Sequence, residues 1–327
     1  MKISPVEKLF TLFNETAIVL QEELFSTYLD ALAETGENIF EGAILQDGLS
    51  ELALKRLEKK YSEIQLDGYT NEEIRKAFQL VILKGMKESA QPNHQMTPDS
   101  VGILIGYLVQ KFMKDGVKSI LDPAVGTGNL LTAVLNNQLT QETSAIGIDV
   151  DDLLIKLAYV NANLQRHPVQ FFNQDSLEPL LVDPVDVVVS DLPVGYYPND
   201  LRAQDYVLKA AEGHSYAHHL LIEQSVKHVK PGGYLFFIVP NGLFESEEAP
   251  RLREFLKEKV IIQGFMQLPL NMFNNKQSAK SILILQKKGE NVEPPKEVLL
   301  VSLPSLSSAQ AMEKILTQIQ SWISENK

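Results

Sequence analysis

The first part of the chain has the hydrophobic spacing of helices. Up to about residue 95, apolar residues recur every three or four positions, which is the period of an amphipathic helix. Thr70 and Glu73 have the spacing of a capping box and stand shortly before the apolar run 74–86. We therefore expect a helical N-terminal domain over residues 1–92.

A change of pattern marks the end of this domain. The segment 88–100 is polar and contains two prolines, which favours a linker followed by a new helix start at Thr97 or Asp99. We place the domain boundary within 89–96 and expect a second domain to extend over 93–289.

Beyond the boundary, short runs rich in β-branched residues alternate with helical stretches. This alternation is typical of a doubly wound α/β domain, in which helices cover both faces of a mostly parallel sheet. The last two runs are separated by too few residues for a crossover helix, so they should pair antiparallel, as in methyltransferases rather than dehydrogenases. The seven expected strands are residues 117–122, 144–150, 169–175, 186–191, 234–240, 260–269 and 280–288.

The end of the chain contains one further strand and helix pattern. A linker with two prolines at 289–297 leads to a strand-like run at 298–304 and to a helical pattern around 309–324. We expect residues 290–327 to form a strand and a helix packed on this second domain.

Composition limits the partners of such a domain. The chain of 327 residues is 44% hydrophobic and has a net charge of −12, so it lacks the cationic excess of most proteins that hold nucleic acid. Residues 1–54 contain ten acidic residues against Lys2 and Lys8, which makes this segment a poor candidate for gripping DNA unaided. A nucleic-acid role therefore requires a local basic patch or a partner subunit.

Several other classes of protein are disfavoured. The sequence shows no basic, apolar signal at its start and no apolar run of about 20 residues, so we expect a cytoplasmic protein without a membrane span. Zero cysteines exclude disulfides, thiolate metal sites and a cysteine nucleophile. His214 and His218 have the spacing of one helical turn, but no acid completes a metal site and we expect no metal. His218 and His219 should instead begin a helix packed behind a loop.

Residues 119–135 have the pattern of a strand, a glycine turn and a helix. Glycines at such a corner let a ligand approach the backbone closely. Leu131 replaces the third glycine of the dinucleotide fingerprint, which argues against NAD, and no Walker lysine follows, which argues against a phosphate loop. The residues expected at the corner are Asp122, Gly126, Gly128 and Asn129.

Acids end the next two expected strands. Asp149 stands about 20 residues after the turn, where a carboxylate can accept hydrogen bonds from both hydroxyls of a ribose. Asp175 ends the third strand, where its carboxylate can accept the amino hydrogens of an adenine ring. Each acid alone is also typical of a helix N-cap. Together with the glycine turn, they indicate a ligand with adenine and ribose but no pyrophosphate, which is S-adenosylmethionine.

The chain resembles the adenine-N6 DNA methyltransferases, most closely the modification subunit of type I restriction systems. The resemblance covers about residues 95–289, in the order QMTPDS, DPAVGTGNLL, GIDVD, NQDSL, SDLPVGYY and the hairpin 268–289. It implies the class I S-adenosylmethionine-dependent methyltransferase fold, with Thr97 in a segment that closes over the cofactor and Pro123 and Thr127 at the turn. The short length and the DLPVGYY variant resemble the stand-alone YtxK-like branch.

The segment SDLPVGYY stands at the catalytic position of that family. The Asn/Asp-Pro-Pro-Tyr/Phe motif of the family orients the exocyclic amine of adenine by a side-chain oxygen and a backbone carbonyl. The resemblance implies that Asp191 and the carbonyl of Leu192 accept the two amino hydrogens, followed by Pro193 at the third position. Leu192 frees a φ angle that proline would fix, so we expect a less preorganised loop.

The fourth position of the motif departs from the family. Val194 replaces the aromatic residue on which a flipped base stacks, and such stacking contributes about 1–3 kcal/mol. Tyr196 or Tyr197 can substitute if the loop bends them inward, and we expect Tyr196 to be the catalytic one. The alternative is that both tyrosines only pack the loop against the next helix.

Three functions remain open from the sequence. The leading hypothesis is methyl transfer to the amino group of adenine in DNA, with a partner protein supplying sequence recognition, because no segment after residue 289 is long or basic enough for a recognition domain. The second is the same chemistry on a protein glutamine or on an RNA amino group, which the acidic composition favours. The third is a cofactor-binding protein without turnover that acts through partners, which Val194 favours.

Overall fold

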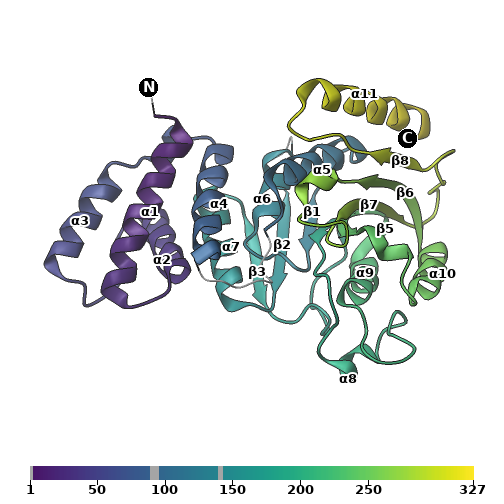
Figure 1. Ribbon diagram of the computed structural model, residues 1–327, viewed down its shortest axis with the longest axis horizontal. Coiled ribbons are helices and arrows are strands. Elements are labelled where there is room, and N and C mark those ends of the chain that lie inside the picture. Colours follow the sequence, from purple (N-terminus) through teal and green to yellow (C-terminus); the bar gives the residue numbers. More distant parts are fainter. Residues whose placement is uncertain (1–2, 89–95, 139–142) are drawn as a thin grey trace.

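Helices fill the first part of the chain, as the apolar spacing predicts (Figure 1). The computed structural model describes residues 3–88, 96–138 and 143–327. The capping box is confirmed, because the Glu73 amide donates to Thr70 Oγ1 over 3.2 Å and the Thr70 amide donates to Glu73 Oε2 over 2.9 Å. The α-helices of the first described range are α1 (Pro5–Leu24), α2 (Tyr28–Glu41), α3 (Glu51–Ser62) and α4 (Asn71–Glu88).

The expected domain boundary falls mostly on residues 89–95, which lie outside the described residues. The chain continues into α5 (Asp99–Phe112), so the helix begins at the second of the two predicted starts. Pro98 stands at the N-cap, where its missing N–H leaves no hydrogen bond unmade.

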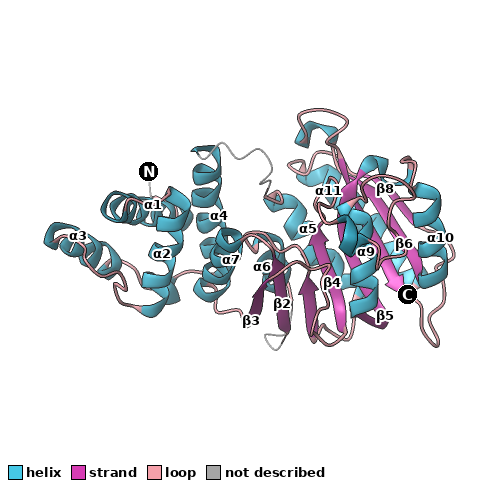
Figure 2. Cartoon of the chain, turned by 90° about the horizontal axis from the view of Figure 1, so that it is seen from below, coloured by secondary structure: helices cyan, strands magenta, loops and turns pink. Residues whose placement is uncertain are grey.

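Eight strands of the described chain form one sheet (Figure 2). Their order is β3–β2–β1–β4–β5–β7–β6–β8. Strand β7 is antiparallel to both of its neighbours, and the other neighbouring strands are parallel. The predicted antiparallel pairing of the last two of the seven expected strands is confirmed. The run 298–304 adds one strand more, because β8 pairs in parallel with β6. The bounds are β1 (Ser119–Asp122), β2 (Ser144–Asp149), β3 (Val169–Asn173), β4 (Val185–Asp191), β5 (Val229–Pro240), β6 (Val260–Gln267), β7 (Lys280–Lys287) and β8 (Leu299–Ser302).

Helices cover both faces of this sheet (Figures 1 and 2). Apolar side chains of α5, α6 and α11 form one core with the sheet, and those of α9 and α10 form another on the opposite face. No helix of the described ranges is long and apolar enough to span a membrane. The bounds are α6 (Asn129–Asn136), α7 (Asp152–Leu164), α8 (Asp200–Ala203), α9 (Ala217–His228), α10 (Ala249–Lys259) and α11 (Ala309–Asn326).

The N-terminal helices lie beside α7, at the β3 end of the sheet (Figure 1). Leu157, Val160 and Leu164 of α7 are buried in the same apolar core as residues of α1, α2 and α4. Burying several aliphatic side chains in this way stabilises the contact, at about 1.5–3 kcal/mol for each fully buried side chain. The helical part is therefore attached to the sheet through α7 as well as through the chain itself.

Candidate active site

The turn between β1 and α6 is built on two glycines. Gly126 and Gly128 have φ angles of 52° and 73°, in the left-handed region that strains any residue with a Cβ atom. A Cβ atom on Gly128 would lie 3.2 Å from the Cβ atom of Ala158 on α7, whereas one on Gly126 would meet nothing within 4 Å. Gly128 therefore lets α6 approach α7, and Gly126 leaves the backbone open to a ligand.

Two acids stand at the carboxyl ends of the neighbouring strands β1 and β2. Asp122 is buried and accepts hydrogen bonds from Ser190 Oγ over 2.8 Å and from the Ala124 amide over 3.1 Å. Burial raises the pKa of Asp122 to about 7. Asp149 accepts the Gly126 amide over 2.8 Å, and burial raises its pKa as well. Asp149 thus shapes the turn, while its oxygens keep lone pairs for further donors.

The acid after β3 contacts the loop after β4. Asp175 Oδ2 accepts the hydroxyl of Tyr197 over 2.5 Å, and Oδ1 accepts the Leu177 amide over 2.9 Å. Tyr197 is buried. Its pKa is raised, mainly by this burial and secondly by the hydrogen bond to Asp175. One carboxylate oxygen that we assigned to an adenine amine is therefore shared with this tyrosine.

Asp191 ends β4 with a donor on each carboxylate oxygen. Thr97 Oγ1 donates to Oδ2 over 3.0 Å, and Lys280 Nζ, at the start of β7, donates to Oδ1 over 2.6 Å. Leu192 is fully buried, and its amide donates to the carbonyl of Ile238 over 3.1 Å. A proline could not make that bond. Burial and this hydrogen bond hold the Leu192 position, which compensates for the free φ angle that we expected to loosen the loop.

A cavity of about 370 Å³ lies beside Asp191. Among the described residues on its wall, the aromatic one is Phe273, from the segment between β6 and β7. Val194 and Tyr196 are 57% and 63% exposed, and the ring of Tyr196 stacks on Tyr216 with centroids 5.1 Å apart. Among the residues that line the cavity are Asp191, Ile238, Leu268, Met272, Phe273 and Lys280.

The histidines after the loop lie as the sequence predicts for a helix behind it. His218 and His219 are buried in the first turn of α9, and burial lowers their pKa values to about 3 and about 4. His214 precedes the helix, is exposed and contacts Asp200 through Nδ1 over 2.9 Å. Within the described ranges, no group of three or more His, Asp or Glu side chains is arranged to hold a metal ion.

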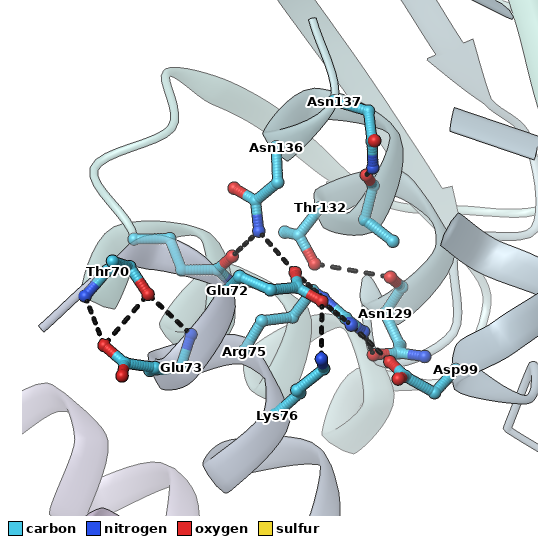
Figure 3. A network of polar contacts seen from close by, with 12 residues as sticks. Thr70, Glu72, Glu73, Arg75, Lys76, Asp99, Asn129, Thr132, Asn136 and Asn137 are labelled. Atoms are coloured by element: carbon cyan, nitrogen blue, oxygen red, sulfur yellow. Dashed lines mark hydrogen bonds and ion pairs between the residues drawn. The ribbon is translucent and has the colours of Figure 1, made fainter. Parts of the chain in front are cut away.

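A fully buried arginine joins the helical part of the chain to this site (Figure 3). Arg75, on α4, donates through Nη1 to Asn129 Oδ1 over 2.8 Å. Its Nε and Nη2 bind the carboxylate of Glu72 over 2.8 and 2.7 Å, and Nη2 also pairs with Asp99 at the start of α5. Asn129 donates to the Thr97 carbonyl over 3.0 Å. Polar contacts therefore run from α4 through the start of α6 to Thr97, which binds the acid at the end of β4.

Comparison with known proteins places the whole arrangement in one family. The family model described as N-6 DNA methylase matches residues 81–322, and the model of the YtxK N-terminal helical domain matches residues 7–86. The chain belongs to the N-6 DNA methylase family. The fold and the family imply that it is an S-adenosylmethionine-dependent methyltransferase of class I.

The known relatives of this chain differ widely in their sequence identity to it. The uncharacterized protein YtxK of Bacillus subtilis (strain 168) is 50% identical over the full length of both chains. A crystal structure of a candidate class I S-adenosylmethionine-dependent methyltransferase from Listeria monocytogenes is 48% identical, with a TM-score of 0.89 over 98% of this chain and 99% of that one. The methyltransferase subunit of a type I restriction–modification system from Streptococcus thermophilus is 17% identical, with a TM-score of 0.67 over 95% and 74%. This last likeness shows the shared fold.

The glycine turn is compatible with S-adenosylmethionine, the cofactor that the fold and the family imply. The space next to Gly126 is open, and Asp149 and Asp175 stand at one edge of the sheet because β2 and β3 are parallel neighbours. The side-chain amide of Asn129 accepts a hydrogen bond from Arg75 and donates one to the Thr97 carbonyl.

Three residues of the site escaped prediction from the sequence: Arg75, Phe273 and Lys280. Phe273 and Lys280 lie in the segment 268–289, which the resemblance marks only as a hairpin. Arg75 is 54 positions from its partner Asn129 and belongs to an ordinary amphipathic pattern. A contact of such long range leaves no local signal in the sequence.

Proposed function

We propose that this methylase transfers the methyl group of S-adenosylmethionine to the exocyclic amino group of an adenine in DNA. The observation that carries the proposal is the position of Asp191. This acid lies at the carboxyl edge of the sheet, beside the glycine turn, and on the wall of a cavity with an aromatic side chain. The family of the chain supports the same chemistry.

The cofactor supplies an electrophilic methyl group on a sulfonium. In the proposal, Asp149 accepts the ribose hydroxyls, and Asp175 accepts the adenine amine beside the hydroxyl of Tyr197. The backbone of Gly126 and Gly128 forms the floor under the cofactor. The remaining cofactor residues of the proposal are Thr97, Asp122, Pro123, Thr127 and Asn129, the last acting through its hydrogen bond to Thr97.

The chain's own residues would then orient the acceptor. Asp191 and the Leu192 carbonyl accept the two hydrogens of the amino group, which turns the nitrogen lone pair toward the methyl carbon. The nitrogen forms a bond to that carbon while the carbon–sulfur bond breaks, and the electron pair of that bond stays on sulfur. One amino proton then leaves past Asp191 to solvent.

The apolar wall of the cavity supports a flat base as the acceptor. Phe273, Met272 and Leu268 offer the surface that Val194 does not. An aromatic ring from a different segment can therefore supply the stacking energy of about 1–3 kcal/mol. In this arrangement Tyr196 stays a candidate only if the loop moves it from its stacked position on Tyr216.

A second candidate acceptor is a protein glutamine or an RNA amino group. The net charge of −12 favours the protein glutamine, because it opposes unaided binding to any nucleic acid, RNA included. For sequence-specific methylation of duplex DNA, the proposal therefore includes a partner protein that supplies cationic surface and sequence recognition.

Two measurements test the proposal. Isothermal titration with S-adenosylmethionine should show binding with a dissociation constant in the micromolar range. Tritiated methyl transfer to unmethylated DNA, RNA and glutamine peptides should label adenine in DNA, with Asp191→Ala as the control. Absence of cofactor binding would refute the methyltransferase proposal, and labelling of peptide or RNA alone would replace the acceptor.

A further inference from the structure

We infer that Lys280 recognises the acceptor base by donating a hydrogen bond to adenine N1, next to the amino group that Asp191 orients. The inference rests on the proposed function and adds to it a residue that determines specificity. Its basis is the pair that Lys280 and Asp191 form on the wall of the cavity.

The geometry of this pair leaves donors for a ligand. Lys280 Nζ lies 2.6 Å from Asp191 Oδ1, and the two side chains are only 17% and 15% exposed. An ammonium group carries three hydrogens, and this contact uses one of them. A base that enters the cavity beside Asp191 therefore meets a carboxylate acceptor and an ammonium donor side by side.

Adenine presents the complementary pair. Its amino nitrogen and N1 are attached to the same carbon, one as a donor and the other as an acceptor. Asp191 can accept an amino hydrogen while Lys280 donates to N1, and the two protein atoms are close enough to contact neighbouring atoms of one ring. N1 is occupied by pairing in a duplex, so this contact requires a base that is flipped out or single-stranded.

Charge also argues for this role. A lone carboxylate in the cavity would attract cationic amines, such as a lysine side chain. The ion pair with Lys280 cancels that attraction and favours a neutral acceptor with an adjoining lone pair. A glutamine amide shares this pattern, but the wall of Met272 and Phe273 favours a flat ring.

The test compares two single-stranded oligonucleotides, one with adenine and one with 1-deazaadenine, which keeps the amino group but lacks N1. Binding is measured by fluorescence anisotropy with the methylase saturated with S-adenosylhomocysteine, and methyl transfer is measured with S-adenosylmethionine. The variants are Lys280→Met, which removes the donor, and Lys280→Gln, which removes the charge but keeps a donor. Lys288→Met, on the exposed far end of the same hairpin, is the matched control.

The wild type should prefer adenine over 1-deazaadenine by about 10- to 100-fold, the contribution of a hydrogen bond to a charged group. Lys280→Met should treat the two oligonucleotides alike, Lys280→Gln should keep part of the preference, and Lys288→Met should keep all of it. If Lys280 only neutralises Asp191, the Met and Gln variants will behave alike.

Other outcomes separate this inference from the proposed function. Methylation of adenine and 1-deazaadenine at equal rates would overturn the role of Lys280 and leave the function standing. Binding of S-adenosylmethionine without binding or methylation of either oligonucleotide would overturn both. Labelling of a glutamine peptide in place of the oligonucleotides would also overturn both.

Discussion

Asp191 already has a partner on each carboxylate oxygen before any acceptor is present. Thr97 lies just before α5 and Lys280 lies at the start of β7, so two distant parts of the chain fix the orientation of the Asp191 carboxylate. Such preorganisation lowers the cost of aligning an amine, because the acceptor oxygen needs no reorientation. Substitutions of Asp191 can therefore distinguish the orienting effect of its acceptor oxygen from the effect of its negative charge.

Asp191→Ala should lower the rate of methyl transfer by about 100-fold or more, since removing one preorganised hydrogen-bonding group typically costs that much. Asp191→Asn keeps an oxygen acceptor and should retain substantially more activity. Affinity for S-adenosylmethionine, measured by titration, should change little in either variant. Equal losses of methyl-transfer rate in the two variants would contradict the idea that an acceptor oxygen without a charge is enough to orient the amine.

Asp122 makes the stability of the protein depend on pH. Its pKa is raised from 3.8 to about 7 in the folded state, so folding binds a proton between these values. The unfolding free energy of the wild type relative to Asp122→Asn should therefore decrease as the pH rises from about 4 to about 7, and stay level above that. The full change is on the order of several kcal/mol at most, at about 1.4 kcal/mol per pKa unit.

Urea unfolding of both proteins at pH 5 and pH 8 measures this difference. The buried His218 and His219 contribute the opposite pH dependence, because the unfolding free energy that they provide decreases as the pH falls below about 6.5. Both proteins share this contribution, so it cancels in the comparison with Asp122→Asn. A difference that does not vary with pH would mean that Asp122 ionises in the folded state as easily as in the unfolded chain.

At the scale of elements, the β1–α6 turn combines two tasks in one short segment. Gly128 permits the approach of α6 to Ala158 on α7, which is a matter of packing. Gly126 faces open space, which is a matter of access for a ligand. The two glycines look equivalent in the sequence, and their surroundings distinguish them.

Gly128→Ala and Gly126→Ala should therefore have different effects. Both place a Cβ atom at a positive φ, which costs about 1–2 kcal/mol of unfolding free energy. Gly128→Ala should lose more stability because its Cβ atom also contacts Ala158 at 3.2 Å. Gly126→Ala should weaken the binding of S-adenosylmethionine by about tenfold or more, through a methyl group in the cofactor's space.

Thermal unfolding and isothermal titration of the two variants test this division. Full cofactor affinity in Gly126→Ala would show that the open space next to this glycine is not where the cofactor lies.

At the scale of the whole molecule, Arg75 connects the N-terminal helices to the site. Its hydrogen bonds reach Asn129 at the start of α6 and Asp99 at the start of α5 (Figure 3). Asn129 in turn donates to the carbonyl of Thr97. The helical part is thus more than an appendage, because it holds two elements that frame the glycine turn. We expect its removal to disturb cofactor binding.

Arg75→Met should reduce the unfolding free energy by about 3 kcal/mol, near the lower end of the cost of breaking a buried ion pair, because Glu72 and Asp99 are about one-third exposed. It should also weaken S-adenosylmethionine binding. Lys76→Met is the matched control, since Lys76 is 40% exposed and its pair with Glu72 contributes about 1 kcal/mol or less. Loss of stability with unchanged cofactor affinity would contradict the connection to the site.

The loop after β4, which we propose to be catalytic, followed from the sequence only in part. Asp191 at the end of a strand, and the helix that begins beside His218 and His219, followed from local patterns and are confirmed as structural features. The sequence did not predict which aromatic ring lines the cavity. That ring belongs to Phe273, between β6 and β7, and not to the loop that contains Val194 and Tyr196. Periodicity reports which face of an element is buried, but not which distant element covers it.

The sequence by itself determined the order and type of the elements, the antiparallel pairing of β7 and the acids at the strand ends. These features depend on neighbouring residues, since burial of one face imposes a period of two or of three to four on the chain. Only the tertiary structure decided that β8 extends the sheet, that Arg75 binds Asn129, and that Lys280 pairs with Asp191. These contacts join residues that lie far apart in the chain. Apolar burial brings their elements together, and the buried charges are then paired because an unpaired buried charge is costly, which no local pattern records.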